Sequence, residues 1–417
     1  MHGVLFKRTL QIRARQCCSI YTARSWNTSD MNHPQIKTLQ IVGDSSYGGA
    51  TYLILEWCKY LVTQGAWVDV LSTDGQTIDR LSRIQGVHTI DQIYIPRAIS
   101  PGADMRAFYR LVNLIRRERY DVVHTYTATP GFLGRVAARL AGVPVILHHQ
   151  AGWSVTPSSS SWEKIIFPSL EILAILTSTK SICVGEAVAR QARRYRLVPT
   201  NRWITIRNGI DPRPFMNGIN PDLRKAFREE VGAGEKCILI GAAGRLYTQK
   251  DPATLIQALQ YLEPRLGGRE VMLLIAGDGP DRDEMEKLTS RLDLCDRVRF
   301  LGFYENIPRF LAGVDIFASS SLWEGLSISL LEAMAAAKPI VATSIEPNAE
   351  LIEHERHGLL VPPRAPQDMA SAICRFIHDP DFAQQCAHSA QQKMLSQYTL
   401  GRMLDETWEL YQQLIES

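Results

Sequence analysis

From Ile36 onward, short runs of apolar residues alternate with longer segments whose apolar residues recur at helical spacing. This alternation is typical of parallel sheets covered by helices on both faces. We expect a first series of strands at Thr38–Val42, Trp67–Leu71, Asp121–Thr125, Val143–Leu147, Ser181–Val184 and Trp203–Ile206. We expect a second series at Cys237–Ala242, Val271–Ile275, Val298–Leu301, Ile316–Ala318, Ile340–Ala342 and Leu359–Val361. The sequence therefore predicts an α/β protein with two doubly wound sheets.

Turn-forming residues divide the chain into domains. The first series ends in Arg207-Asn208-Gly209-Ile210-Asp211-Pro212, which favours a first domain over residues 34–212 and a second over 213–395. Residues 396–417 are predicted to hold a final helix over Leu400–Ile415, because its apolar residues recur every three or four positions. Residues 1–33 have the composition of a disordered basic leader. The alternative is a misassigned start codon, with translation beginning at Met31.

Composition limits the class of protein. At 417 residues the chain is long enough for two sizeable cores. No run approaches the ~20 apolar residues that cross a membrane. The eight cysteines show no spacing typical of a zinc site. We therefore expect a cytoplasmic protein, in a reducing compartment, without a structural metal.

The net charge of +3 hides an excess of Lys and Arg in the first half and of Asp and Glu in the second. One basic cluster comprises Arg106, Arg110, Arg116, Arg117 and Arg119. The other comprises Arg190, Arg193, Arg194, Arg196, Arg202 and Arg207. Each is either a solvated face or a dock for an anionic membrane surface or lipid-linked diphosphates. Nucleic acid is disfavoured, because aromatic residues are not interleaved with the charges.

Two glutamates, Glu324 and Glu332, lie eight residues apart. On one continuous helix they would point ~80° apart, so we expect Glu324 in a turn at Gly325 and Glu332 on a helix that opens near Leu326. The amides of Leu326 and Ser327 would then face the same space as both carboxylates. Such amides bind phosphate, and carboxylates bind diols, which predicts a site for an anion flanked by hydroxyls. The alternative is a buried amphipathic helix with two solvated glutamates.

Further candidates follow the carboxyl ends of predicted strands, where doubly wound sheets bind ligands. Gly48 and Gly49 would let backbone amides approach a phosphate, although their spacing is not the dinucleotide fingerprint. Arg245 and Lys250 would clamp a diphosphate without a metal, unless they are simply solvated.

Glycines and histidines end other strands. Gly277 and Gly302 are expected to shape the wall of a nucleotide pocket. His124, His148 and His149 end two strands of the first series, where a histidine is more often structural than reactive. Of the three, His149 is retained as a catalytic candidate.

Taken together, these loops resemble those of the retaining nucleotide-sugar glycosyltransferases of the GT-B type, family four, also called group 1. The motifs that carry the resemblance are Gly-Arg-Leu followed by Lys-Asp-Pro, Ala-Gly-Asp-Gly-Pro, Arg-Phe-Leu-Gly-Phe, Trp-Glu-Gly-Leu and Leu-Leu-Glu-Ala-Met-Ala. Asp121–Thr125 is similar to the start of the family's acceptor-side motifs. The resemblance covers about residues 36–415. It implies two Rossmann-like domains facing across a cleft, with the last helix crossing back to the first domain.

The resemblance also implies a role for each motif. Glu332 would hold the ribose diol, and Glu324 the hydroxyls of the donor sugar. The diphosphate would lie against the side chains of Arg245 and Lys250 and the amides of Leu326 and Ser327. Gly48 and Gly49 would roof the donor phosphate. The nucleotide sugar is a co-substrate, so no cofactor and no metal are expected.

Two motifs depart from the family. Many relatives have His-Gly-Trp where this chain has Ala151-Gly152-Trp153, and Val-Ser where it has Val184-Gly185. Front-face retaining transfer does not need that histidine, because it depends on leaving-group stabilisation and positioning. We therefore predict hexosyl transfer to a glycan, lipid-linked, at the cytoplasmic face of a membrane. The alternatives are a nucleotide-sugar epimerase or hydrolase and a non-catalytic nucleotide-sugar-binding partner.

Overall fold

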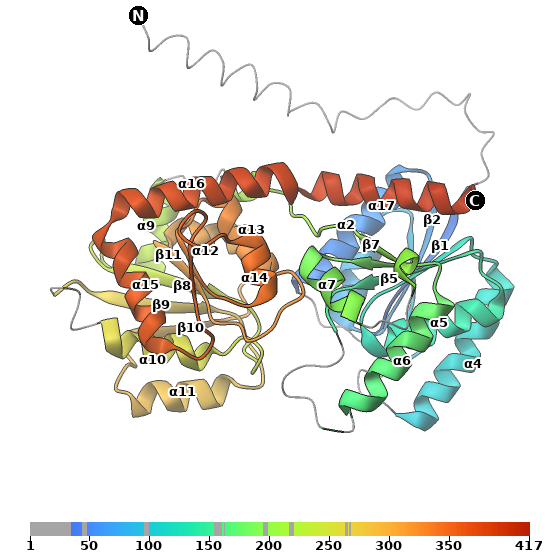
Figure 1. Ribbon diagram of the computed structural model, residues 1–417, viewed down its shortest axis with the longest axis horizontal. Helices are drawn as coiled ribbons and strands as arrows, with labels where there is room; N and C mark the ends of the chain where they lie inside the picture. The colour runs from blue at the N-terminus through green and yellow to red at the C-terminus, as the bar shows by residue number, and fades with distance from the viewer. Residues whose placement is uncertain are drawn as a thin grey trace, which may run out of the picture. The chain divides into compact units, whose positions relative to one another are not determined.

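Two parallel sheets with the same strand order form the framework of the protein (Figure 1). The computed structural model describes residues 35–43, 48–95, 100–153, 161, 163–194, 199–216, 221–262, 266 and 268–417, without the side chains of 101, 163–165 and 194. Within these residues the first sheet has seven strands, ordered β3-β2-β1-β4-β5-β6-β7, and the second has six, ordered β10-β9-β8-β11-β12-β13. Each sheet starts at an inner strand and winds out to both edges, which confirms the predicted α/β, doubly wound fold. The expected leader lies outside the described residues.

The first domain holds the strands of the first sheet and the helices between them. Its strands are β1 (Lys37–Gly43), β2 (Trp67–Ser72), β3 (Val87–Ile90), β4 (Val122–Thr125), β5 (Val145–Gln150), β6 (Lys180–Cys183) and β7 (Trp203–Thr205). Its helices are α2 (Gly49–Thr63), α3 (Gly75–Ser82), α4 (Pro101–Glu118), α5 (Ala128–Ala141), α6 (Glu163–Thr177), α7 (Glu186–Arg194) and the 3-10 turn η1 (Thr200–Arg202). The six expected strands are present, and β3 is an additional short edge strand.

The second domain is built in the same way. Its strands are β8 (Ile238–Ala243), β9 (Val271–Ala276), β10 (Val298–Gly302), β11 (Ile316–Ser319), β12 (Ile340–Thr343) and β13 (Leu359–Val361). The helices are α8 (Arg213–Met216), α9 (Pro221–Glu230), α10 (Pro252–Leu262), α11 (Arg282–Arg291), α12 (Ile307–Gly313), α13 (Ile328–Ala335), α14 (Glu346–Leu351), α15 (Pro366–His378) and α16 (Pro380–Gln397). The final helix, α17 (Leu400–Ile415), has the predicted bounds.

Side chains of the first sheet alternate between two cores. On one face Leu39 and Ile41 pack with Leu111 and Ile115 of α4 and with residues of α5. On the other face residues of β2, β4 and β5 pack with α2 and with α17, whose Tyr411 is fully buried. Because strand side chains point alternately to opposite faces, a strand buried on both sides reads as a continuous apolar run. This explains why these strands were visible in the sequence.

The chain passes between the two domains twice, and the two passages are paired. Ile210 donates its N–H to the carbonyl of Tyr398 at 3.0 Å, and Leu400 donates to the carbonyl of Ile210 at 2.9 Å. Gly209 is required here, because a Cβ at this position would lie 2.1 Å from the carbonyl oxygen of Thr399. Residues Ile36–Ser417 thus form one compact unit that contains both sheets.

Candidate active site

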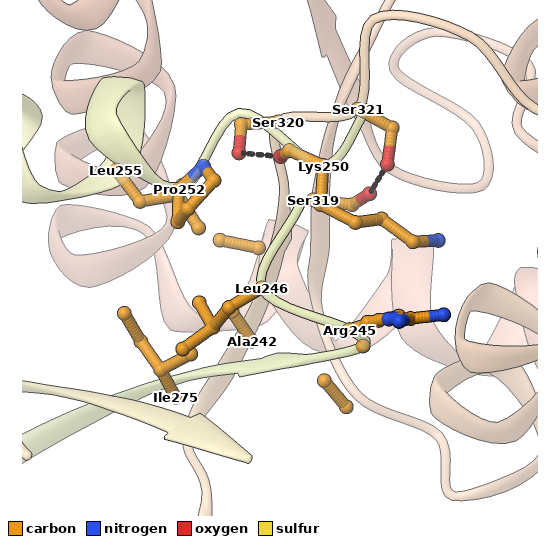
Figure 2. Close-up of a pocket in the computed structure, with 13 residues that line it drawn as sticks. Ala242, Arg245, Leu246, Lys250, Pro252, Leu255, Ile275, Ser319, Ser320 and Ser321 are labelled. Carbon is orange, nitrogen blue, oxygen red and sulfur yellow. Dashed lines mark hydrogen bonds between the residues drawn. The ribbon is translucent and has the colours of Figure 1, made fainter. Parts of the chain in front are cut away.

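The loop after β8 positions the two predicted cations. Arg245 and Lys250 line one pocket, together with Ala242, Ala243, Gly244, Leu246, Pro252, Leu255, Ile275, Ala318, Ser319, Ser320 and Ser321. Their side chains extend in the same direction from this loop (Figure 2). The backbone of the loop is fixed from β11, because the hydroxyl of Ser320 donates to the carbonyls of Lys250 and Asp251, each at 2.7 Å. The two cationic groups therefore face a common space.

Lys250 forms an ion pair with the first of the two predicted glutamates. Its Nζ lies 2.5 Å from Oε1 of Glu324, whose side chain is only 7% exposed. The other carboxylate oxygen of Glu324 accepts a hydrogen bond from Nε2 of Gln249 at 3.3 Å. A carboxylate has about four acceptor positions, so Glu324 retains capacity for hydroxyl groups of a ligand.

The second glutamate lies beside the same lysine. Glu332 is on α13, and burial raises the pKa of its carboxyl to about 8, an effect that the positive charge of Lys250 partly offsets. A carboxyl with this pKa is largely protonated at neutral pH and can donate as well as accept a hydrogen bond. Lys250 is therefore paired with Glu324 and lies close enough to Glu332 to affect the pKa of its carboxyl.

The N-termini of two helices from different domains meet near these residues. Gly48 is the N-cap of α2, and Ser327 is the N-cap of α13. A Cβ built on Gly49 would lie 3.1 Å from the side chain of Ile328, so the two helix ends approach closely. Amides in the first turn of a helix have no partner within it and favour an anion. The geometry therefore provides two sets of amide donors near Lys250.

The helix that carries Glu332 begins later in the chain than predicted. α13 begins at Ile328, two residues after Leu326, because the hydroxyl of Ser327 accepts a hydrogen bond from the amide of Leu330 and caps the helix there. Leu326 lies before the helix, and its side chain is buried. Phosphate binding by the amides of Leu326 and Ser327 stays a prediction, and those of Ile328 and Ser329 join them as candidates.

Two of the predicted pocket glycines pack against backbone. A Cβ on Gly277 would lie 1.9 Å from the carbonyl oxygen of Gly244, and Gly277 also pairs with Gly302 in an isolated antiparallel bridge. Gly302 has a φ of +67°, which favours glycine. These glycines hold the ends of β8, β9 and β10 together, and their contact with a nucleotide stays a prediction.

The loop that departs from the family reaches the second domain. A Cβ on Gly325 would lie 1.5 Å from the carbonyl oxygen of Ala151, so the backbones of the two loops are in direct contact. Ala151 follows β5, and Gly325 follows Glu324. The segment that carries Ala151 in place of the family's histidine therefore lies against the acidic loop.

The three histidines lie within the first domain. Nε2 of His149 donates to Oδ1 of Asn208 at 2.9 Å, His148 pairs with the hydroxyl of Thr125 at 2.9 Å, and His124 pairs with the hydroxyl of Tyr411 at 2.9 Å. Burial lowers the pKa of all three imidazoles, which keeps them neutral. Each therefore has a partner on the first domain or on α17, and a catalytic role for His149 stays a prediction.

Sequence reasoning missed two features of this region. The first is Gln249, whose contact with Glu324 follows from its place beside Lys250 in the same loop. The second is the role of Glu350 of α14, whose carboxylate accepts the amides of Glu186 and Ala187 at 2.9 and 2.7 Å and so caps α7 of the first domain. Gly185 makes room for it, since a Cβ there would lie 3.1 Å from that carboxylate. The replacement of the family's Val-Ser by Val184-Gly185 was the available signal.

Membrane-spanning helices and metal clusters are both missing from the described residues. Within them, no helix combines the length and the apolar character needed to cross a bilayer. In the same part of the chain, no group of three or more His, Cys, Asp or Glu side chains is arranged to hold a metal ion.

Comparisons with known proteins cover both domains. The family model described as glycosyl transferases group 1 matches residues 224–393, and the one described as glycosyltransferase family 4 matches residues 47–213. The chain is 28% identical, over 76% of its length and 81% of the relative's, to the UDP-Gal:alpha-D-GlcNAc-diphosphoundecaprenol alpha-1,3-galactosyltransferase of Escherichia coli. It is also 28% identical, over 66% and 71% of the two chains, to a GDP-mannose-dependent alpha-(1-6)-phosphatidylinositol monomannoside mannosyltransferase of Mycobacterium tuberculosis.

Solved structures agree on the fold. The chain matches Anabaena HepE in complex with UDP and glucose with a TM-score of 0.77 and 23% identity, over 91% of this chain and 100% of that one. It matches the sucrose-phosphate synthase of Thermosynechococcus elongatus with a TM-score of 0.78 and 19% identity, over 92% and 100%. With two doubly wound sheets, the family's motifs at their carboxyl ends and family models matching each domain, the chain belongs to the group 1 glycosyltransferases and has their GT-B fold.

Proposed function

We propose that the protein transfers a hexose from a nucleotide diphosphate sugar to a lipid-linked glycan, with retention of the anomeric configuration. The observation that carries this proposal is the position of Lys250, which is paired with Glu324 and lies close enough to Glu332 to alter its pKa. Arg245 points into the same space. Two cations and two acids in one place match a pyrophosphate that bears a sugar on each side.

In this proposal the donor binds mainly to the second domain. Glu332 accepts hydrogen bonds from the ribose diol, and Glu324 uses its remaining acceptor positions for hydroxyls of the hexose. Arg245 and Lys250 bind the diphosphate, assisted by amides at the start of α13 and by Gly48 and Gly49 at the start of α2. Gly277 and Gly302 shape the wall of the nucleotide pocket.

The transfer step follows from this arrangement. The bond between C1 of the hexose and the phosphate oxygen breaks, and a bond from the acceptor hydroxyl oxygen to C1 forms on the same face. The acceptor proton passes to the departing phosphate oxygen, so that no separate base is required. The negative charge that develops on the leaving diphosphate is stabilised by Arg245, Lys250 and the helix amides, and the proposal includes no metal. His149 has no required role in this step.

The acceptor class rests on the relatives. One carries diphosphoundecaprenol in its name and another phosphatidylinositol monomannoside, and both acceptors are lipid-linked. An acceptor held in a membrane requires that the enzyme works at the membrane surface, so we propose peripheral attachment.

A donor screen followed by a transfer assay tests the function. Thermal-shift measurements with UDP-, GDP- and ADP-sugars are expected to identify one donor that raises the melting temperature by several degrees. Transfer of that sugar to a lipid-diphosphate acceptor, with the anomeric configuration read by NMR, is the second step. No stabilisation by any nucleotide sugar, or an inverted product, would contradict the proposal.

A second candidate function is a non-catalytic partner that binds a nucleotide sugar. Ala151 favours it, because the backbone contact between Ala151 and Gly325 occurs where the resemblance implies a histidine near the donor sugar. The transfer assay separates the two functions. Tight donor binding without turnover, on lipid-linked and free glycans alike, would identify the partner, and turnover would exclude it.

A further inference from the structure

In the basic cluster that runs from Arg190 to Arg207, two arginines are paired with acids, and Arg196 lies outside the described residues. Arg190 forms an ion pair with Glu346 at 2.6 Å, and Arg207 lies 3.7 Å from the carboxylates of both Glu186 and Glu350. These acids belong to α7 and to α14 of the second domain. Arg190 and Arg207 therefore contribute to contacts between the domains.

In the other cluster, on α4, three arginines have no acidic partner among the contacts described. Arg106, Arg110 and Arg116 of α4 donate to the backbone carbonyls of Gly102, Gln92 and Leu140, at 3.3, 3.4 and 3.1 Å. A carbonyl is uncharged and leaves the guanidinium charge uncompensated. Of the two acids of this helix, Glu118 pairs with Lys37 and Arg117, whereas Asp104 accepts the amide of Ser100 and keeps its charge, so the arginines of the helix outnumber its acids.

Three helices lie together on this side of the first domain. Figure 1 shows α4, α5 and α6 next to one another. The contact of Arg116 with the carbonyl of Leu140 joins α4 to α5, and the buried ion pair of Arg135 with Glu171, at 3.2 Å, joins α5 to α6. The three helices thus present one continuous outer face, on which Arg139 of α5 adds a further exposed arginine.

Large apolar side chains gather on the same face. Of the 14 large hydrophobic residues that are exposed in the described part of the chain, six lie on these three helices, each at least 45% exposed. They are Met105, Tyr109, Leu140, Ile166, Leu173 and Leu176. The three helices make up only a small part of the chain, so this concentration is not a random scatter of surface residues.

We propose that the outer face of α4, α5 and α6, defined by these six apolar residues and by Arg106, Arg110, Arg116, Arg117, Arg119 and Arg139, docks on an anionic lipid bilayer. Apolar side chains interleaved with arginines match the bilayer interface, where the apolar groups insert and the guanidinium groups meet headgroup phosphates. The proposal deepens the proposed function, on which it rests, because a lipid-linked acceptor must be reached from the membrane.

Co-sedimentation of the full-length protein with vesicles tests the docking face. The wild type is expected to bind vesicles of phosphatidylcholine with phosphatidylglycerol, and to bind vesicles of phosphatidylcholine alone only weakly. Binding is expected to be lost as NaCl is raised from about 50 to about 300 mM, a range around about 0.15 M, where the Debye length is about 8 Å. The double variant Arg106→Glu/Arg110→Glu is expected to reduce partitioning by more than about 25-fold, at about fivefold per basic side chain. The variant Met105→Ser/Tyr109→Ser is expected to reduce it by about tenfold or more.

The matched control is Arg83→Glu/Arg356→Glu, which changes the net charge equally on other elements. Arg83 and Arg356 are exposed and paired with Asp79 and Glu353. Only control and test variants with equal melting temperatures are compared, so that unfolding is not mistaken for lost docking. Equal binding by the control and the arginine variant, or equal binding to both vesicle types, would overturn the proposal. If the wild type is a dimer and Met105→Ser/Tyr109→Ser converts it to a monomer, the face is instead an interface with a second copy of the chain.

Transfer to a short-chain, water-soluble acceptor separates this proposal from the proposed function. The docking variants are expected to keep wild-type turnover on that acceptor. If the wild type shows turnover but does not bind anionic vesicles, the docking face alone is overturned. Vesicle binding without turnover on any acceptor would overturn the transferase function and leave the docking face standing.

Discussion

The two sheets have the same strand order, but the groups at their carboxyl ends differ in chemistry. In the first domain these groups are neutral: His124 and His148 are buried and His149 is half-buried, and each is hydrogen-bonded to a residue of that domain or of α17. In the second domain they are charged and partly accessible, with Lys250 paired to Glu324 in loops beyond the strands. The histidines lie on the strands themselves, where the covering helices exclude water.

This difference shows that the fold determines where a site lies, whereas the loops determine its chemistry. A histidine on a strand under a helix is held neutral and oriented, which suits a structural hydrogen bond. A lysine in a loop keeps its charge and reaches a ligand. We expect binding and stabilisation of the diphosphate to depend on the charged residues of the second domain, and not on the histidines of the first.

The largest expected effect is on turnover. Lys250→Ala is expected to lower kcat by about 100- to 1000-fold, because it removes a cation that stabilises the leaving diphosphate. His149→Ala is expected to lower it by less than about tenfold, since the imidazole bonds to Asn208 and not to the reacting groups. Steady-state kinetics with the identified donor measure both. A larger loss for His149 than for Lys250 would reverse the comparison, and Lys236→Ala, an exposed lysine, is the control.

A smaller effect is expected on donor affinity. Glu332→Ala is expected to raise the donor Kd by about 5- to 100-fold, because it removes two hydrogen bonds to the ribose diol, each of which contributes about 0.5–1.5 kcal/mol. Calorimetric titration measures the change. An unchanged Kd would remove Glu332 from the nucleotide site.

The same residue makes stability depend on pH in a defined sense. The pKa of Glu332 is raised to about 8 in the folded protein, above the usual value near 4.5, so its contribution is favourable at low pH and is lost as the pH rises through about 8. The melting temperature of Glu332→Gln is therefore expected to rise relative to that of the wild type from about pH 5 to about pH 9, a range that includes the folded pKa of about 8. A constant difference across this range would show that the carboxyl is already ionised at neutral pH.

The first domain is expected to respond to loss of a buried hydrogen bond. Tyr411→Phe removes the hydroxyl that bonds to His124 at 2.9 Å and is expected to cost about 1–3 kcal/mol of unfolding free energy. Denaturant titration measures this cost, and kcat is expected to stay within about twofold, since Tyr411 does not touch the proposed site. A large loss of kcat at unchanged stability would place the His124 group in the chemistry.

The smallest expected effect is at acid pH. Burial lowers the pKa of all three histidines, so the unfolded chain binds more protons than the folded one below about pH 6.5. The melting temperature is therefore expected to fall as the pH drops below that value, and His124→Gln to reduce the slope. Equal slopes for wild type and variant would mean that His124 is protonated in the folded protein. The two domains thus lose stability at opposite ends of the pH range.

Much of the fold could be predicted, because strands buried on both faces read as apolar runs. β3 escaped prediction since it is a short edge strand in which His88 alternates to the exposed side. The start of α13 was placed two residues early, because a serine at 327 caps the helix and a turn fills the space after Gly325. Local sequence reveals the period of an element better than its first residue.

The grouping of Lys250 with Glu324 and Glu332 followed from the order of strands, since all three come after strands of one sheet. Contacts between the domains did not follow. The cap that Glu350 provides to α7 and the contact of Gly325 with Ala151 join loops about 160 to 170 positions apart. Such contacts depend on the angle between two domains, for which a sequence has no periodic signal.

The return of α17 to the first sheet has a consequence for biosynthesis. Its Leu404 and Tyr411 complete a core whose other members are translated long before them. While the ribosome makes the second lobe, the nascent first lobe displays the apolar bed of Trp57 and Leu61 without its cover. The cores of the second domain need α15 and α16, which are both made before α17, so the domain that is synthesised first is completed last. We therefore expect a chaperone that binds the nascent chain to bind at the apolar surface that α17 later covers.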